Sequence, residues 1–234
     1  MSLKIGIVGA AGYAGAELIR LVLGHPEFEL VAITSNADAG QPLSAVYPSF
    51  AGVSDLVFTT HDAPELKSCD AVFLAVPHTA AMAQVPALLA AGVSCFDLSA
   101  DYRLSDPSVF EAWYAAEHTS PELLKTRAFG LPELFCQDVE NAASSHAAGK
   151  PVLVACAGCY PSATSLAAAP AVRAGWVAEN GPVIVDAISG VTGAGKSCNA
   201  RTHFCSADEN LEAYGVGKHR HTPEIEQILG LTDR

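Results

Sequence analysis

The chain has 234 residues, of which half are hydrophobic and only 16% are charged, so it can bury a large core and is not a disordered protein. Its formal net charge is −12 and no cluster of Lys or Arg occurs, which excludes a basic nucleic-acid-binding face. No apolar run approaches the ~18 residues needed to span a bilayer, so we expect no membrane segment.

The first 150 residues alternate apolar strands with helices. Strands are predicted at 5–8, 29–34, 70–76 and 93–98, and helices at 16–23 and about 80–91. Leu18, Leu21 and Val22 are expected to share the buried face of the first helix. Continuous apolar strands separated by helices are typical of a parallel sheet covered on both faces. We therefore predict a Rossmann-like, doubly wound α/β domain over residues 1–150.

From Pro151 the pattern changes, and residues 151–234 are predicted to begin a second, α+β domain for substrate binding and dimerisation. Strands are expected at 152–155 and 182–188, and helices at about 162–174 and 222–229. For the last helix, Thr222 is predicted as the N-cap and Pro223 as the first helical residue.

A glycine-rich turn follows the first strand, with the spacing G-x-x-G-x-x-G. Glycines allow a pyrophosphate to approach the backbone, and the following helix N-terminus offers amides and positive potential. The alternative is a plain strand–helix turn, but this position, after the first strand and before a helix, favours a nucleotide site. The candidate cofactor-binding residues of this turn are Gly9, Ala11, Gly12, Tyr13, Ala14 and Gly15.

The end of the second strand discriminates between cofactors. A carboxylate there would bind the ribose hydroxyls of NAD, whereas this chain has small polar residues, beginning with Ser35. They leave room for a 2′-phosphate and favour NADP. Asp38, slightly further on, weakens that preference unless it is an ordinary loop acid. His78, after the third strand, is another candidate for cofactor contact.

Cys156-Ala-Gly-Cys159 lies between a strand and a helix and has several interpretations. Both thiols could form a redox pair, or both could be buried structural residues. A zinc site would need further ligands, and no second C-x-x-C exists, so no metal is expected. The third interpretation is a single nucleophile at Cys159, because Gly158 before it and Tyr160-Pro161 after it predict a sharp, exposed turn.

Other polar segments could complete an active site. His219 and His221 flank Arg220 just before the last helix and could supply the acid/base group that a thiol nucleophile needs. The glycine-rich run from Ser189 to Lys196, with Gly190 and Gly193, is too short for a Walker motif but could close over the cofactor or substrate. After the 93–98 strand, Ser99 and Arg103 are candidates for binding a substrate anion, with a surface salt bridge as the alternative for the arginine.

Six motifs together resemble those of the N-acetyl-gamma-glutamyl-phosphate reductase family. This family acts in arginine biosynthesis and is related to aspartate-semialdehyde dehydrogenase. The segments that carry the resemblance are Gly9–Leu18, Phe96–Arg103, Gly130–Glu133, Gly158–Pro161, Ser189–Gly195 and His219–Glu224. The glycine turn alone would be weak, but Gly-Cys-Tyr-Pro and His-Arg-His are highly specific together.

The resemblance implies NADPH-dependent reduction of an acyl phosphate to an aldehyde, with Cys159 as the nucleophile and His219 or His221 moving the proton. It does not say which histidine acts. Backbone amides at the start of the Cys159 helix would steady the oxyanion. A homo-oligomer is expected because an exposed substrate-domain sheet often pairs with a second copy. The absence of a signal peptide or disulfide pattern predicts a cytoplasmic protein.

Two departures from the family are visible. Cys156-Ala157 stands where the family usually has Asn-Pro or a similar pair, and the family continues well past the His-Arg-His helix. The chain is therefore expected to be truncated and to bind cofactor poorly or be inactive. The alternatives are a related reductase of aminoadipyl or aspartyl phosphate, a non-catalytic NADP-binding homologue, and a C-x-x-C redox protein.

Overall fold

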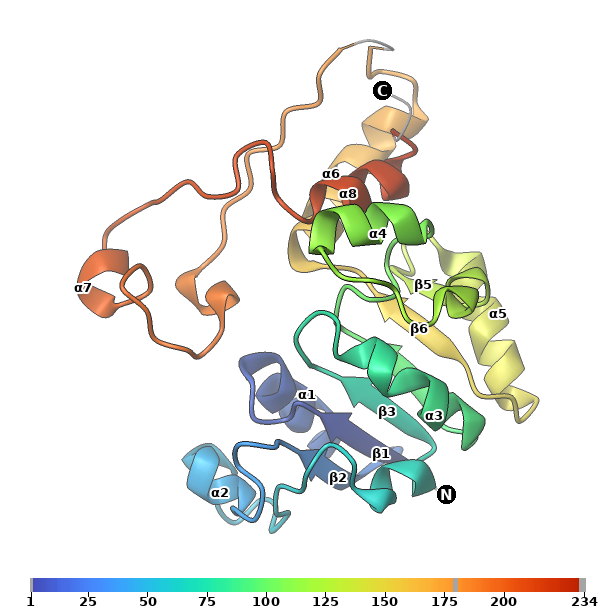
Figure 1. Cartoon of the computed structure of the whole chain (residues 1–234), viewed down its shortest axis with the longest axis vertical. Helices are drawn as coiled ribbons and strands as arrows, with labels where there is room; N and C mark the ends of the chain where they lie inside the picture. The colour runs from blue at the N-terminus through green and yellow to red at the C-terminus, as the bar shows by residue number, and fades with distance from the viewer. Residues whose placement is uncertain (1, 179–180, 232–234) are drawn as a thin grey trace.

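A computed structural model describes residues 2–178 and 181–231 of the chain. Its centre is one sheet of six parallel strands in the order β2-β1-β3-β4-β6-β5 (Figure 1). The strands are β1 (Leu3–Val8), β2 (Phe28–Thr34), β3 (Ala71–Leu74), β4 (Ser94–Asp97), β5 (Ala128–Gly130) and β6 (Leu153–Cys156). The Rossmann-like α/β fold expected from the sequence is confirmed.

Helices connect the strands and cover the sheet. The α-helices are α1 (Tyr13–Leu23), α2 (Leu43–Val46), α3 (Val85–Ala90), α4 (Pro107–Tyr114), α5 (Cys136–Ala147), α6 (Cys159–Arg173), α7 (Phe204–Ala207) and α8 (Thr222–Leu229). Short 3-10 helices are η1 (Pro48–Phe50), η2 (Pro64–Ser68), η3 (Ala81–Ala83), η4 (Pro121–Lys125) and η5 (Val191–Ala194). In the part of the chain that the structure describes, no helix combines the length and apolarity needed to cross a membrane.

The core lies on both faces of the sheet, because successive side chains of a strand point to opposite sides. In β3, Ala71 belongs to one apolar cluster and Leu74 to the other. In β4, Cys95 and Phe96 likewise pack into different clusters. This two-sided burial explains why the strands are continuous apolar runs.

The prediction of a strand at 182–188 is wrong. Residues 181–190 form no regular secondary structure, and Ile184 is 85% exposed. They begin an extended segment, residues 181–218, which we call the arm. A strand is held by hydrogen bonds to a neighbouring strand, and the described ladders pair none with this segment.

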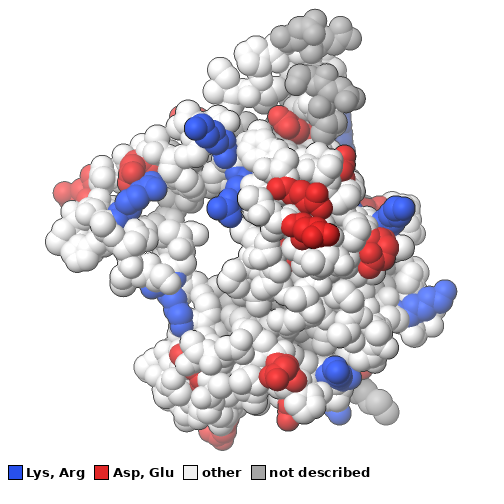
Figure 2. Space-filling model, viewed as in Figure 1, with Lys and Arg blue, Asp and Glu red and all other residues white. Residues whose placement is uncertain are grey.

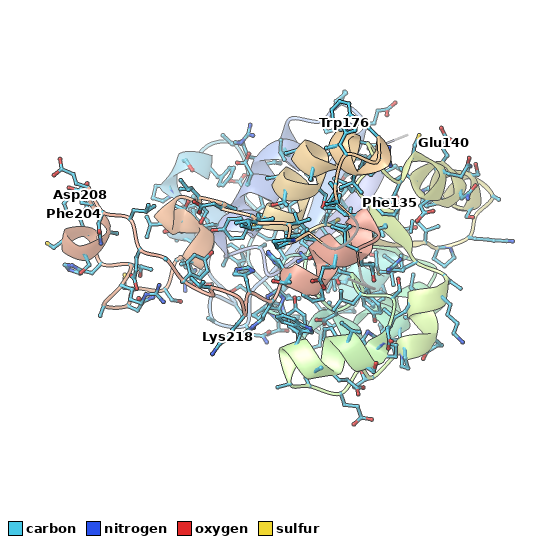
Figure 3. The ribbon with its side chains drawn as sticks, turned by 90° about the horizontal axis from the view of Figure 1, so that it is seen from above. Phe135, Glu140, Trp176, Phe204, Asp208 and Lys218 are labelled. Carbon is cyan, nitrogen blue, oxygen red and sulfur yellow. The ribbon has the colours of Figure 1, made fainter. Side chains whose placement is uncertain are left out.

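The arm leaves the body after α6 and returns at α8 (Figure 1). Phe204 and Asp208 lie at its far end, away from the sheet (Figure 3). Figure 2 shows an open gap between the arm and the sheet-containing body. The only regular structure in the described arm is η5 and α7.

Four helix predictions need correction. Leu21 is 53% exposed, and α1 instead buries Ile19 and Val22. The helix expected at about 80–91 is divided into η3 and α3, with Pro86 at the start of α3, where its missing N–H is tolerated. The helix expected from residue 162 begins at Cys159. At the last helix, His221 rather than Thr222 is the N-cap.

Strand β6 lies between β4 and β5, inside the same sheet as the strands before residue 150. Helix α6 follows it and packs against α8 through Ala169 and Leu229. The segments on either side of residue 150 therefore share one sheet. The two helices that flank the arm, α6 and α8, are joined by an apolar contact.

Candidate active site

The parallel sheet brings distant loops to one edge. The segments after β1, β3, β4 and β6 all leave the carboxyl edge, because neighbouring strands run in the same direction. They carry the glycine turn, His78, Arg103 and Cys159 respectively. The chain passes from β1 to β2 on one side and then to β3 on the other, so the edge contains the topological switch point at which ligands bind in open α/β sheets.

The glycine turn is tightly packed at its first and last glycines. Gly9 has φ +79°, and a Cβ there would lie 2.3 Å from the carbonyl oxygen of Ala75. At Gly15 a Cβ would lie 2.5 Å from the carbonyl oxygen of Gly9. The first helical residues, Tyr13, Ala14 and Gly15, have no intrahelical acceptor for their N–H groups. The turn therefore fits a pyrophosphate, with close backbone approach and free amide donors.

Gly15→Ala is expected to lower the free energy of unfolding by about 2 kcal/mol, because the clash is with backbone that cannot rotate away. Gly12→Ala is the matched control, since its Cβ would meet only the carbonyl oxygen of Gly9 at 3.5 Å. Urea unfolding of both variants measures the difference. Equal stabilities would contradict the packing explanation.

The end of β2 presents a hydroxyl next to a carboxylate. Ser35 is nearly buried and its Oγ donates a 2.7 Å hydrogen bond to Asp38. Asp38 is thus not a remote loop acid. His78, after β3, accepts a hydrogen bond from the N–H of Ala100 through Nδ1, and burial lowers its pKa.

Cys159 is the first residue of α6 and is exposed, with Gly158 as the N-cap. Gly158 donates its N–H to the carboxylate of Glu224 at 2.8 Å, and Ser162 donates to the carbonyl oxygen of Gly158. Pro161 has no N–H. The amides of Cys159 and Tyr160 are therefore the two donors at this helix start that could face a developing oxyanion.

The second thiol of the C-x-x-C differs from the first. Cys156 ends β6, and burial, reinforced by Asp97, raises the pKa of its thiol to about 12. A thiol with so high a pKa is a poor nucleophile and a poor redox partner at neutral pH. All seven cysteines are free thiols. Over residues 2–178 and 181–231, no group of three His, Cys, Asp or Glu side chains could hold a metal ion.

The two histidines lie beside the residue that follows the nucleophile. The Tyr160 ring centre is 5.3 Å from that of His219 and 6.1 Å from that of His221. His219 accepts the N–H of His221 on Nδ1, at 3.1 Å, so a neutral His219 carries its proton on Nε2. His221 is more deeply placed: its Nδ1 is buried and has no hydrogen-bond partner among the described residues.

Burial, aided by the charge of Arg103, lowers the pKa of His221 from 6.5 to about 3. The folded protein therefore holds this ring neutral, whereas the unfolded chain binds a proton below about pH 6.5. The stability that depends on neutral His221 is complete above that pH and is lost as the pH falls toward 3.

We accordingly expect the free energy of unfolding of the wild type to fall more than that of His221→Asn between about pH 7.5 and about pH 5. Urea unfolding at the two pH values measures the difference. His203→Asn, in the exposed arm, is the control and should follow the wild type. A parallel loss in His221→Asn would contradict the burial argument.

The two residues predicted to bind a substrate anion, Ser99 and Arg103, are buried and form hydrogen bonds within the protein. Arg103 is 5% exposed, and it donates from Nε to the carbonyl oxygen of Cys156 at 2.8 Å and from one terminal nitrogen to that of Leu98 at 2.6 Å. Its other terminal nitrogen lies 3.5 Å from Glu224. Ser99 Oγ donates to the carboxylate of Asp97, so both side chains are engaged within the protein.

The glycine-rich run from Ser189 to Lys196 belongs to the exposed arm, which includes Gly190 and Gly193. It is tied to the nucleophile helix because Tyr160 donates its hydroxyl to Ser189 Oγ at 2.8 Å. Tyr214, near the other end of the arm, donates to the Tyr160 hydroxyl, also at 2.8 Å. One tyrosine beside Cys159 therefore contacts both halves of the arm.

Sequence reasoning missed Glu224 and Tyr214. Glu224 lies in the first turn of α8, where an acidic residue favours the helix start, yet its side chain is 1% exposed. A buried carboxylate needs partners, but its partners lie 66 and 121 residues away in the chain. No local pattern signals such contacts.

Two family models match the chain. The model described as the NAD binding domain of semialdehyde dehydrogenase matches residues 4–142, and the one described as the semialdehyde dehydrogenase dimerisation domain matches residues 159–234. Together they cover β2–β5, all but the first residue of β1, and the segment from Cys159 onward, whereas β6 lies between the two matches.

The chain is similar to curated proteins named N-acetyl-gamma-glutamyl-phosphate reductase. It is 46% identical over 227 residues to that of Halorhodospira halophila and 48% identical over 228 residues to that of Syntrophobacter fumaroxidans. Each match covers 97% of this chain and 63% of the relative, so the chain spans less than two thirds of their length.

Among solved structures, the fold is similar to that of the Candida albicans aspartate semialdehyde dehydrogenase with NADP. The TM-score is 0.55 at 19% identity, over 74% of this chain and 48% of the other. At that identity the likeness concerns the fold alone.

Proposed function

This chain belongs to the semialdehyde dehydrogenase family, and we propose that it carries the nucleophile and cofactor residues for reducing N-acetyl-gamma-glutamyl phosphate to N-acetylglutamate 5-semialdehyde with NADPH. The observation that carries the proposal is the placement of exposed Cys159 at the start of α6, on the sheet edge that holds the glycine turn. The next residue, Tyr160, packs its ring against those of His219 and His221. The choice of substrate rests on the names of the relatives.

In the proposed reaction the Cys159 thiolate attacks the acyl carbon, the bond from that carbon to the phosphate oxygen breaks, and phosphate leaves with the electron pair. The product is a thioester on Cys159. NADPH, when bound along the glycine turn, supplies the hydride that reduces this thioester. The resulting oxyanion takes a proton to give a thiohemiacetal. When that hydroxyl proton is returned, the C=O bond re-forms as the C–S bond breaks, which releases the aldehyde and the Cys159 thiolate.

The amides of Cys159 and Tyr160 are the proposed oxyanion donors, because the Gly158 N–H is already bonded to Glu224. His219 is the proposed proton donor. Its Nδ1 is occupied by the His221 N–H, which leaves the proton on Nε2, and its ring is less buried than that of His221. His221 is then the neutral neighbour of His219.

The cofactor assignments form one set: the glycine turn for the pyrophosphate, Ser35 for the ribose 2′-phosphate, and His78, Gly190 and Gly193 for further contacts. Small residues at the end of β2 support NADP, although the hydrogen bond between Ser35 and Asp38 brings a carboxylate near that phosphate. The similar Candida albicans structure is described with NADP. Ser99 and Arg103 are proposed to shape the binding of the substrate anion.

We further propose a cofactor half at 1–150 and a catalytic half at 151–234, which share the sheet through β6. The match to a dimerisation domain supports a homo-oligomer. The seven free thiols fit a reducing compartment such as the cytoplasm. The high thiol pKa of Cys156 disfavours the C-x-x-C redox alternative.

The function is tested by phosphate-dependent reduction of NADP with N-acetylglutamate semialdehyde, in parallel with aspartate semialdehyde, the aminoadipate analogue, and NAD in place of NADP. Where the chain turns over, the proposal predicts activity only with N-acetylglutamate semialdehyde and a preference for NADP. A preference for another aldehyde would instead identify the chain as a reductase of the corresponding acyl phosphate. Binding of NADPH without turnover of any substrate would support the non-catalytic alternative.

A further inference from the structure

A buried carboxylate connects the nucleophile turn with the rest of the site. The Glu224 side chain, 1% exposed, accepts the Gly158 N–H on Oε1 at 2.8 Å, and its Oε2 lies 3.5 Å from the guanidinium of Arg103. We propose that Glu224 is a positioning residue, which fixes the Cys159 turn, Arg103 and the histidines in a single arrangement. The proposal rests on the proposed function and deepens it.

The first connection runs through Arg103. Its rigid guanidinium joins the carbonyl oxygen of Leu98, after β4, to that of Cys156, at the end of β6. These two contacts leave one terminal nitrogen directed at Glu224. The carboxylate therefore sets the orientation in which Arg103 can offer its remaining N–H groups to a substrate.

The second connection runs through α8. Glu224 lies in the first turn of this helix, three residues after His221. A Cβ built on Gly158 would lie 2.8 Å from Arg103, 2.9 Å from His221 Nε2 and 3.1 Å from Glu224 Oε2. All three side chains thus converge on the residue before the nucleophile. When Glu224 holds Gly158, it also holds the start of α8 and its histidine against that turn.

The buried carboxylate of Glu224 is stabilised by the groups that it contacts. Burial raises the pKa of its carboxyl, whereas Arg103 and the Gly158 N–H oppose that rise. The carboxylate is thus stabilised by the same two groups that it positions. Glu226, two residues further along α8, is less buried and serves as the matched control.

The test uses the whole chain and compares wild type, Glu224→Ala, Glu224→Gln and Glu226→Gln. NMR hydrogen exchange of the Gly158 amide is measured against that of Val154 in β6 and Phe96 in β4. In Glu224→Ala we expect the Gly158 amide to exchange at least about tenfold faster while the sheet amides keep their protection. Glu224→Gln, which still offers an oxygen acceptor, should restore most of the Gly158 protection, and Glu226→Gln should match the wild type.

A kinetic readout then separates positioning from folding. Wherever the wild type turns over, Glu224→Gln should lower kcat by about tenfold or more with KM changed less than about threefold, because Arg103 loses its partner but the fold remains. Unchanged Gly158 exchange in Glu224→Ala, or uniform acceleration across the sheet, would overturn the proposal. Absence of wild-type turnover would count against the proposed function, while the exchange result would still decide whether Glu224 holds the turn.

Discussion

Cys159→Ser is expected to abolish covalent capture of the acyl phosphate, with the rate of phosphate release falling by at least about a thousandfold. Serine keeps the size of the side chain but replaces the thiol with a hydroxyl, which ionises far less readily and is a much weaker nucleophile. Cys156→Ser should remain within about threefold of wild type, because that thiol is only half-buried at the end of β6 but has a pKa of about 12, raised mainly by desolvation.

The measurement is a single-turnover experiment without NADPH, in which thioester formation blocks further chemistry. N-acetyl-gamma-glutamyl phosphate is mixed with the chain, and released phosphate and the mass of the Cys159 peptide are followed together. One acyl group on Cys159 for each phosphate released is expected. Equal losses in Cys159→Ser and Cys156→Ser would instead support the redox pair. Labelling of Cys136, Cys198 and Cys205, which are also exposed, serves as the control for nonspecific acylation.

The sheet was predictable because its signal is local and repeated. Buried parallel strands must be apolar throughout, and each is followed by a turn or helix start, so β1, β2, β3, β4 and β6 could be found from short windows. Strand β5 has only three residues and gives no such signal. The run 182–188 has a strand's composition, but composition does not provide the neighbouring strand that a ladder requires.

Site residues were predictable from the sequence where they directly follow the end of a predicted strand. Cys159 and the glycine turn satisfy that condition, and the parallel sheet brings them to the same edge. Burial of Arg103 and Glu224 could not be anticipated, because it depends on where α8 packs. The sequence therefore identifies the reacting groups better than the residues that hold them.

Gly158→Ala is expected to reduce acyl transfer by about 100-fold, while lowering the free energy of unfolding by only about 1–2 kcal/mol. Gly158 has φ −67° and ψ 163°, which any residue can adopt, so the effect is not backbone strain. The added methyl would meet Arg103 at 2.8 Å and His221 at 2.9 Å. Both contacts are side-chain ends and can shift, but Arg103 is held by two carbonyl oxygens, so relief must come from displacing the site.

Gly12→Ala is the matched control for this prediction. Gly12 is also an N-cap, with φ −80° and ψ 167°, and its Cβ would meet only the carbonyl oxygen of Gly9, at 3.5 Å. Acyl transfer requires no cofactor, so Gly12→Ala should retain it even if NADPH binding weakens. Phosphate release and urea unfolding are measured for both variants. A Gly158→Ala protein with wild-type acyl transfer would show that the convergence of Arg103, His221 and Glu224 on this turn is not needed for the nucleophile to react.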